Sequence, residues 1–399
     1  MRQDFNIDHT LTALVLAALP QTPEGVLTAF GDHNAFFSAL SGISRIDAKN
    51  GPIVKKAGLD ESDLFRAIPD SEPFYAEKLF ERLALRWEKT RPSLPAVAYA
   101  WLHRLRLAAS TCEQQKKLNN AVLLAAVRAE MVRGKPAPDN TPQPDEPAYH
   151  SRLHFLHVLQ ATCHLIEVND GLSDKKAVTL TNRDKTLLML AALVHDLDHP
   201  GGGNVKDKSG KFILYQIEDK SFAIADKLFE ACGLSEEERG IIHTLLRATD
   251  PNGPHKFMKD AMKAHEANQN ISLSDIVPGE EERCKDLAPL LAGKKLCYMA
   301  AILSDADLFS SAGAGLRMNQ INSEKFTQEK RGAGEPDCDL TTPEARVHFC
   351  NNIVGETGFA SAAGRAAFNA SFGKMLRETF AEIEAAKKAQ EQTPALKQT

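Results

Sequence analysis

The chain has 399 residues, of which 43% are hydrophobic and 25% charged, with a formal net charge of −5. This is the composition of a globular protein with one large domain or two smaller ones, and the charge argues against nucleic acid as a partner. No apolar run reaches membrane-spanning length and no signal-peptide pattern opens the chain. The seven cysteines are widely spaced without a CxxC pair, so we expect reduced thiols and a cytoplasmic location.

Helical periodicity dominates the chain. Apolar and charged residues mix at helical spacing in segments 76–87, 96–109, 113–133, 221–232 and 236–248. No run of alternating β-branched residues is bounded by hairpin turns, so the sequence predicts an all-α fold. Four stretches read as irregular because they are rich in proline, glycine or polar residues: 136–147, 201–210, 268–282 and 332–342.

The first group of residues suited to chemistry lies at 149–158. His150 and His154 are four residues apart, so on a helix their imidazoles share one face and could enter one pocket. The alternative is an amphipathic, histidine-rich helix whose side chains are solvated.

The second group, His195-Asp196-Leu197-Asp198-His199-Pro200-Gly201, directly follows the apolar run 187–194. A buried helix that ends in two imidazoles and two carboxylates needs a partner for them, and a divalent cation is the simplest one. The alternative is an ordinary helix end at which one of the aspartates caps the next turn.

The third group places Asp305 and Asp307 at the end of another apolar helix, where helix termination is again the alternative. Together, the histidines and aspartates of three separate helices would make a mixed nitrogen and oxygen site. Such ligands suit Zn²⁺, Mn²⁺ or Mg²⁺, and a second cation could share a carboxylate in phosphoester hydrolysis.

These motifs resemble the HD-domain superfamily and, within it, the class I cyclic nucleotide phosphodiesterases. The family pattern YHNxxHAxDVxQ is similar to residues 149–160, and HDxDHPGxxN is complete over 195–204. The family's TD pair resembles Thr249-Asp250, its ADL triplet resembles Ala306-Asp307-Leu308, and its QxGF element resembles Glu356-Thr357-Gly358-Phe359. The order and approximate spacing hold over about 210 residues, from 149 to 359.

The resemblance implies a compact multi-helix bundle with its metal site in a central pocket. We expect an N-terminal helical segment over 1–72, separate or packed on the rest, a catalytic domain over 73–385 and a frayed tail over 386–399. It also implies a metal-dependent phosphodiesterase that opens a 3′,5′-cyclic nucleotide to the 5′-monophosphate through a metal-bound hydroxide. The partner would be a small nucleotide, with neither nucleic acid nor membrane involved and protein partners unknown.

Residue roles follow from the same resemblance. Zn²⁺ would occupy the tighter site and Mg²⁺ or Mn²⁺ a second site, bridged by Asp196. His150 would be the general acid, a role to which histidine is suited as a residue type, and His199 would orient the hydroxide or a ligand. The implied metal ligands are His154, His195, Asp196 and Asp307, and the implied substrate-binding residues are Tyr149, Asp250, Glu356 and Phe359, the last as a wall of a base clamp.

Several positions depart from the family pattern. Ser151 replaces an asparagine, His157 replaces an aspartate, and Ser304 replaces a histidine. Glu356 replaces a glutamine, and an ionised carboxylate only accepts hydrogen bonds, so it would favour the two adjacent donors of guanine. Alternatively, Glu356 faces solvent or this short motif is aligned wrongly.

The departures leave two other functions open. An HD-type phosphohydrolase could act on another nucleotide or phosphodiester, since the altered positions belong to the pocket and not to the metal ligands. A degenerate module that only binds nucleotide or metal would be expected to lack a ligand or the acid, and none is missing here.

Overall fold

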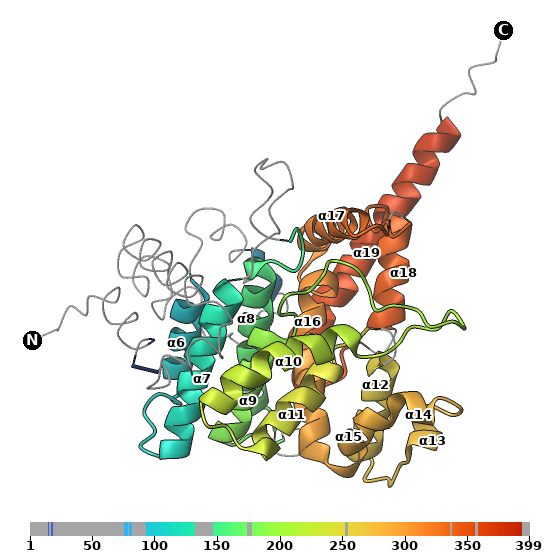
Figure 1. The fold of residues 1–399 in the computed structure, drawn as a ribbon. Coiled ribbons are helices and arrows are strands. Elements are labelled where there is room, and N and C mark those ends of the chain that lie inside the picture. The colour runs from blue at the N-terminus through green and yellow to red at the C-terminus, as the bar shows by residue number, and fades with distance from the viewer. Residues whose placement is uncertain are drawn as a thin grey trace, which may run out of the picture.

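The computed structural model describes residues 15, 17–18, 76–78, 80–81, 93–131, 147–173, 178–251, 254–335, 337–355 and 358–392. Within these ranges the fold is all-α, as predicted: β-structure is limited to one isolated bridge between Lys206 and Phe212. The helices pack into one bundle around a continuous apolar core (Figure 1). In chain order they are α6 (Leu94–Arg104), α7 (Glu113–Glu130), α8 (Arg152–Gly171), α9 (Asn182–Val194), α10 (Gln216–Ala231), α11 (Glu236–Arg247), α12 (Pro254–Glu266), α13 (Leu273–Ile276), α14 (Glu281–Cys284), a 3₁₀ turn (Lys285–Leu287), α15 (Ala288–Ala292), α16 (Lys294–Ala312), α17 (Leu316–Gly332), α18 (Pro343–Ile353) and α19 (Ala362–Gln392).

Helices α8, α9 and α16 form the centre of the bundle. Residues 186–194 of α9 and 297–306 of α16 are buried without a break, so each helix is covered on every side. A helix that is apolar all round belongs in the interior, while amphipathic helices such as α10 and α11 cover it. Because α16 packs along α8 and also touches α9, the ends of these three helices converge on one place.

Local signals explain where several helices begin. Thr181 and Asp184 form a capping box at the start of α9, and Ser235 and Glu238 form another at the start of α11. At α19 the cap comes from a distant helix: the buried carboxylate of Asp305 accepts hydrogen bonds from the backbone of Ala360 and Ser361, both at 2.7 Å.

The expected irregular stretches are only partly irregular. Segment 201–210 is loop, but the segment 268–282 contains α13 and the first turn of α14. The proline-rich stretch 136–147 lies outside the described residues except for Pro147. The predicted boundary at 72 falls in a part of the chain that the structure does not describe, so the domain limits stay a prediction.

The tail expected to fray from residue 386 begins as helix, because α19 continues to Gln392. This segment is composed of alanine, lysine, glutamine and glutamate, which are strong helix formers even without tertiary contacts. Its last turns project away from the bundle (Figure 1).

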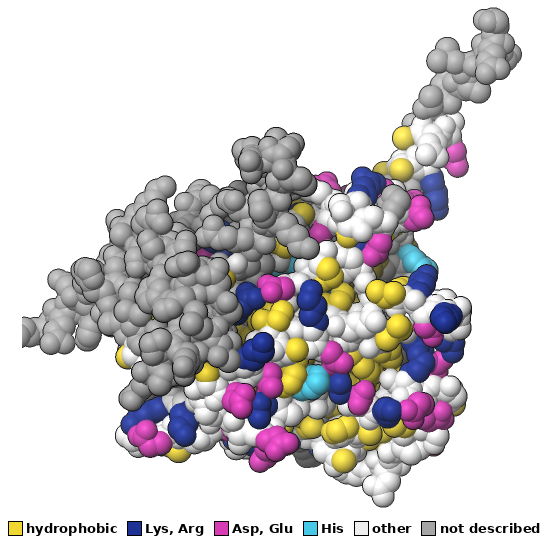
Figure 2. All heavy atoms as spheres, viewed as in Figure 1, with side chains coloured by type: hydrophobic (Ala, Val, Ile, Leu, Met, Phe, Trp, Pro, Cys, Tyr) yellow, Lys and Arg dark blue, Asp and Glu magenta, His cyan; other side chains and the backbone are white. Residues whose placement is uncertain are grey.

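The surface carries both acidic and basic side chains. On the face drawn in Figure 2, acidic and basic side chains are interspersed, and neither sign forms an extended field. No single described helix is long and apolar enough to cross a membrane; only the sharply bent pair Glu281–Ala292 and Lys294–Ala312 satisfies the length and composition test jointly. None of the seven cysteines forms a disulfide.

Candidate metal centre

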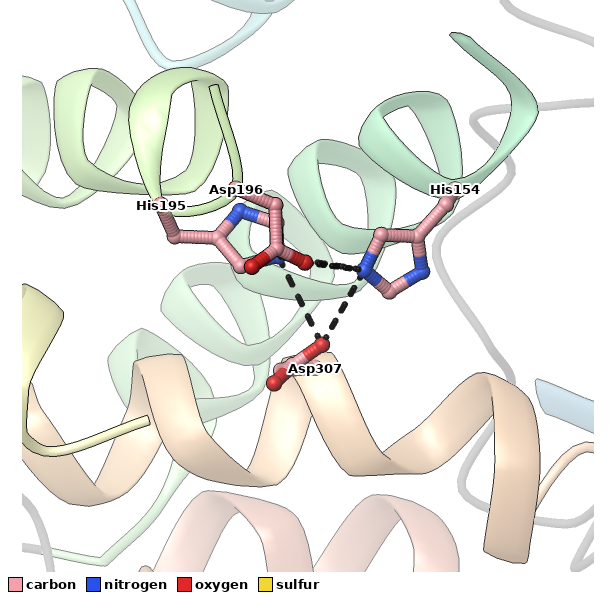
Figure 3. Close-up of side chains that lie close together, drawn as sticks. All are labelled: His154, His195, Asp196 and Asp307. Carbon is pink, nitrogen blue, oxygen red and sulfur yellow. Dashed lines mark hydrogen bonds and ion pairs between the residues drawn. The ribbon is translucent and has the colours of Figure 1, made fainter. Parts of the chain in front are cut away.

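Four side chains from three helices converge at the centre of the bundle (Figure 3). His154 comes from the first turn of α8, His195 and Asp196 follow the last turn of α9, and Asp307 lies in the second half of α16. The Nε2 atom of His154 lies 3.1 Å from His195 Nε2, 3.1 Å from Asp196 Oδ2 and 3.3 Å from Asp307 Oδ1. The four residues that the sequence predicted as ligands are therefore brought together.

The spacing of these atoms fits a cation in their midst. Neighbouring ligands of a zinc ion at about 2.0–2.2 Å lie roughly 3.0–3.5 Å apart in octahedral or tetrahedral geometry. The Nε2 atom of His195 lies 3.0 Å from Asp196 Oδ2 and 3.5 Å from Asp307 Oδ1, within that range. Two buried imidazole nitrogens that face each other at 3.1 Å also need a positive ion between them unless one is protonated. The donor set therefore suits a divalent cation.

A hydrogen bond orients the imidazole of His195 towards the cluster. Its Nδ1 atom donates to the backbone oxygen of Ala192 at 3.0 Å, which leaves Nε2 with a lone pair directed at the cluster. The ring is fully buried at the end of α9, so the carbonyl of the preceding turn fixes its tautomer.

The histidines of the cluster lower the pKa values of its two carboxyl groups. Burial by itself raises the pKa of the Asp307 carboxyl, but hydrogen bonds and charge from His154 and His195 bring it below its ordinary value. The Asp196 pKa is lowered in the same way, chiefly by the charge of His195 and then of His150. Both carboxyls are thus ionised over the whole physiological pH range, as cation ligands must be.

A second histidine pair lies next to the four ligands. The rings of His150 and His199 stack with centroids 3.5 Å apart, and His150 Nε2 lies 3.7 Å from Asp196 Oδ2. His199 Nδ1 accepts a hydrogen bond from the amide of Gly201 at 3.0 Å. Burial, and then the charge of His150, lower the pKa of His199 to about 3, so this ring is neutral at working pH.

Glu329 of α17 completes this pair, and the sequence analysis missed it. Its Oε1 atom accepts a hydrogen bond from His150 Nδ1 at 2.5 Å, and Oε2 accepts from the amides of Tyr149 and His150. Burial raises the pKa of this carboxyl, but the hydrogen bond and charge of His150 and the two amides lower it to about 2. An ionised Glu329 keeps the proton of His150 on Nδ1 and directs Nε2 towards Asp196.

Comparisons with known proteins agree with this geometry. Residues 149–312 match the family model of the 3′,5′-cyclic nucleotide phosphodiesterases. The matched region contains the four converging side chains. A Caenorhabditis elegans protein described as "Probable 3′,5′-cyclic phosphodiesterase pde-6" is 26% identical over 242 residues, which are 55% of this chain and 29% of that protein. The chain therefore spans less than a third of this relative's length.

The crystal structure of yeast caPDE2 shares 12% sequence identity with a TM-score of 0.44, and the alignment covers 96% of this chain and 95% of that chain.

A cavity opens beside the four predicted ligands. His150, Asp196, His199 and Asp307 line it, together with the following residues: Tyr149, Gly202, Gly203, Asn204, Ile217, Glu218, Thr249, Pro251, Leu308, Ser311, Phe326, Lys330 and Phe349. Tyr149 shares a hydrogen bond with Ser311, and its ring centroid lies 4.9 Å from that of His154. Tyr149 therefore lines the cavity, and its contact with substrate stays a prediction.

Asp250 supports the cavity wall without lining the cavity. Its Oδ2 atom accepts hydrogen bonds from Asn204 Nδ2 at 2.9 Å and from the Tyr215 amide at 2.8 Å, which ties the HDxDHPGxxN segment to the start of α10. Its neighbours Thr249 and Pro251 line the cavity, and Asp250 itself does not. This geometry favours a positioning role over the predicted direct contact with substrate.

Glu218 is a second residue that the sequence analysis missed. It lies in the first turn of α10, is 5% exposed and lines the cavity. Burial, and then the charge of Asp250, raise the pKa of this carboxyl well above its ordinary value.

The predicted base clamp differs in the structure. Phe359 is 2% exposed and packs among Phe309, Phe368 and Phe372, so its ring belongs to the core and not to the cavity lining. The phenylalanine rings that line the cavity are those of Phe326 and Phe349, with centroids 6.2 Å apart, and Tyr149 adds a third aromatic ring. Glu356 lies outside the described residues.

Proposed function

We propose that the chain is a metal-dependent phosphodiesterase that hydrolyses a 3′,5′-cyclic nucleotide to the nucleoside 5′-monophosphate. The observation that carries this proposal is the position of the His150–Glu329 pair beside four converging cation ligands in one cavity. The family match supports it, and residue roles and substrate belong to the proposal.

We assign two cations to this site. His154, His195, Asp196 and Asp307 would hold Zn²⁺, and Mg²⁺ or Mn²⁺ would occupy a second position next to it. A divalent cation supplies Lewis-acid stabilisation of phosphoryl charge and a nucleophilic water at neutral pH. Asp196, the ligand that also lies nearest to His150, is the carboxylate suited to bridge two ions.

In this proposal a residue of the protein protonates the leaving group. As the oxygen of water joins phosphorus and the bond from phosphorus to the 3′ oxygen breaks, His150 donates its Nε2 proton to that oxygen. The proton that water loses restores the protonated His150, so that one water molecule is added in total. Glu329 holds the imidazole in place through Nδ1, and it stabilises the protonated ring that precedes the transfer. The stacked, neutral His199 supports the ring of His150 from one side without competing for the proton.

Substrate choice within this function rests on pocket residues. We keep Glu356 as the candidate for purine selection, with guanine favoured because a carboxylate accepts from two donors. Glu356→Gln should then lower the ratio of cGMP to cAMP turnover, and an unchanged ratio would remove Glu356 from this role.

A substrate panel tests the proposal. The metal-replete chain should hydrolyse cAMP or cGMP faster than a cyclic dinucleotide, a nucleoside monophosphate or bis(4-nitrophenyl) phosphate. A clear preference for one of the last three would favour the alternative of an HD-type phosphohydrolase with another substrate. Tight binding of cyclic nucleotide without any turnover would instead indicate a binding module.

A further inference from the structure

A second cavity opens at the other end of the central helices. Its volume is about 450 Å³, against about 120 Å³ for the cavity beside the predicted ligands, and no described residue lines both. On α16, Tyr298 of the second cavity lies nine residues before Asp307, which is roughly 14 Å along the helix axis. On α8, the C-cap residue Leu172 lies eighteen residues after His154, or roughly 27 Å. The second cavity is therefore separate from the candidate cation site.

Much of the wall of this second cavity is apolar. Sites for small organic molecules have volumes of roughly 300–1,000 Å³ and walls that are mostly apolar, with a few polar groups that orient the ligand. Removing the apolar surface of a ligand from water is favourable in such a site. The described apolar side chains that line the cavity are those of Leu172, Val178, Met262, Ala362 and Ala366.

Positive charge exceeds negative charge at the same wall. Lys294 and Arg365 line the cavity, and Glu266 is the one carboxylate among its described lining residues. Arg365 donates to Glu266 Oε1 at 2.5 Å and to the backbone oxygen of Ala360 at 2.5 Å, which uses two of its five N–H groups. Lys294 also begins α16, whose first turn has no side-chain cap and therefore leaves backbone amides as donors. One positive charge and several donors thus remain for a ligand.

The buried hydroxyl of Tyr298 adds a further donor. This residue is 1% exposed, and its oxygen accepts a hydrogen bond from the amide of Ala363 at 3.3 Å. Burial raises the pKa of the phenol to about 12, so the hydroxyl keeps its proton, and the charges of Arg365 and Glu266 act on it as well. Among the residues that the structure describes, none accepts a hydrogen bond from this hydroxyl. A buried donor without an acceptor is costly, and an oxygen atom of a ligand satisfies it.

We propose that this second cavity, with its apolar wall beside Lys294, Arg365 and the Tyr298 hydroxyl, binds a small amphiphile that carries one carboxylate. The carboxylate accepts hydrogen bonds from Arg365 and Tyr298 and balances the charge of Lys294. The apolar chain of the ligand covers the aliphatic side chains of the wall. A second negative charge on the ligand is disfavoured, because Glu266 already faces Arg365.

Calorimetric titration of the full, metal-saturated chain tests this proposal. The probes are octanoate, octan-1-ol and acetate, which separate the carboxylate from the apolar chain. Octanoate should bind at one site per chain and about tenfold more tightly than octan-1-ol, because its hydrogen bonds are charge-assisted. It should also bind at least about 100-fold more tightly than acetate, which has almost no apolar surface to bury. No binding of octanoate, or equal binding of octanoate and either other probe, would overturn the proposal.

Variants locate the bound probe. Lys294→Met should remove most of the advantage of octanoate over octan-1-ol, and Ala366→Trp should abolish the binding of both by filling the cavity. Both positions are exposed, so neither change disturbs the core. Lys295→Met is the matched control: it removes the next cation of α16, which pairs with Asp184 at 3.0 Å and does not line the cavity, so binding should be unchanged. Tyr298→Phe removes only the buried hydroxyl and should weaken octanoate binding by about fivefold.

A carboxylate also binds metal ions, so the titration is repeated on the chain stripped of its cations. Octanoate should bind the stripped chain as tightly as the loaded one, because the second cavity shares no described residue with the cation site. Binding that disappears with the cation, or that survives unchanged in Ala366→Trp, would overturn the proposal. Turnover of cyclic nucleotide enters none of these measurements, so this site and the proposed function fail separately.

Discussion

Glu329 accepts a hydrogen bond from Nδ1 of His150 across a separation of 179 residues, and the two side chains are only 7% and 9% exposed. The pair links α17 to the start of α8 at the cavity where α8, α9 and α16 place the four predicted ligands. The proposed general acid and its carboxylate partner thus lie beside the candidate cation site, as the proposed phosphodiester hydrolysis requires.

The first expectation concerns Asp307. Asp307→Asn keeps the size of the side chain but removes the negative charge that the cation needs, so bound metal and turnover should fall together, turnover by more than about 100-fold. Elemental analysis of the purified variant and a cyclic nucleotide assay measure the two quantities. Asp198→Asn is the matched control, since the second aspartate of HDxDHPG pairs with Arg128 at the surface and should retain both metal and turnover. Full metal content in Asp307→Asn would remove this residue from the ligand set.

His150 should separate metal binding from catalysis. His150→Ala is expected to keep the bound cation, while turnover of cyclic nucleotide falls by about 10²–10⁴-fold because the leaving oxygen is no longer protonated. An aryl diester with a good leaving group, such as bis(4-nitrophenyl) phosphate, needs no general acid and should lose much less activity. Equal losses on both substrates would contradict the general-acid role.

Glu329 should affect how the free energy of unfolding changes at acid pH. Its pKa of about 2 lies below the ordinary value of 4.5, so its stabilising contribution is present above pH 4.5 and is lost as the pH falls towards 2. The contribution amounts to roughly 3 kcal/mol. Urea unfolding of the metal-free chain between pH 5 and pH 3 should therefore show a shallower loss of stability for Glu329→Gln than for the wild type. Parallel curves would show that the carboxylate carries no such interaction.

His157 is one of the departures from the family pattern. It should change the free energy of unfolding in a higher pH range than Glu329 does. It is 2% exposed and packs against the ring of Phe80, and burial, followed by the charge of His154, lowers its pKa to about 3. Since the unfolded chain takes up a proton near pH 6.5, the free energy of unfolding should fall by up to about 1.4 kcal/mol per pH unit from pH 6 to pH 4. His157→Gln should remove that part of the slope, and a slope equal to that of the wild type would contradict a buried neutral imidazole.

The sequence predicted the four converging side chains because their chemistry is concentrated in short motifs behind apolar helices. Glu329 could not be found in this way, since it lies in the polar run Gln328-Glu329-Lys330-Arg331, which has the composition of a solvated helix face. Only the packing of α17 over the cavity makes Glu329 and Lys330 buried. Glu218 was missed for the same reason, because a glutamate in the first turn of a helix is ordinary in sequence.

Phe359 shows the opposite error. A local motif suggested a substrate-facing ring, but three phenylalanines from α16 and α19 provide an apolar site for it, and burial there is more favourable than exposure at the cavity. Aromatic residues outside that motif, Phe326 and Phe349, line the cavity instead. Pairings of this kind depend on how α16, α17, α18 and α19 pack, which periodicity does not specify.

The most direct test of the account is a metal titration with product analysis. The chain is stripped of cations with a chelator, and bound cation and turnover of cAMP and cGMP are measured together as Zn²⁺, Mg²⁺ or Mn²⁺ is restored. We expect turnover to be absent in the stripped chain, to rise in proportion to bound cation, and to yield the 5′-monophosphate. Full turnover without bound cation, or a fully loaded chain that hydrolyses no phosphodiester, would contradict the claim that these four residues form a hydrolytic metal centre.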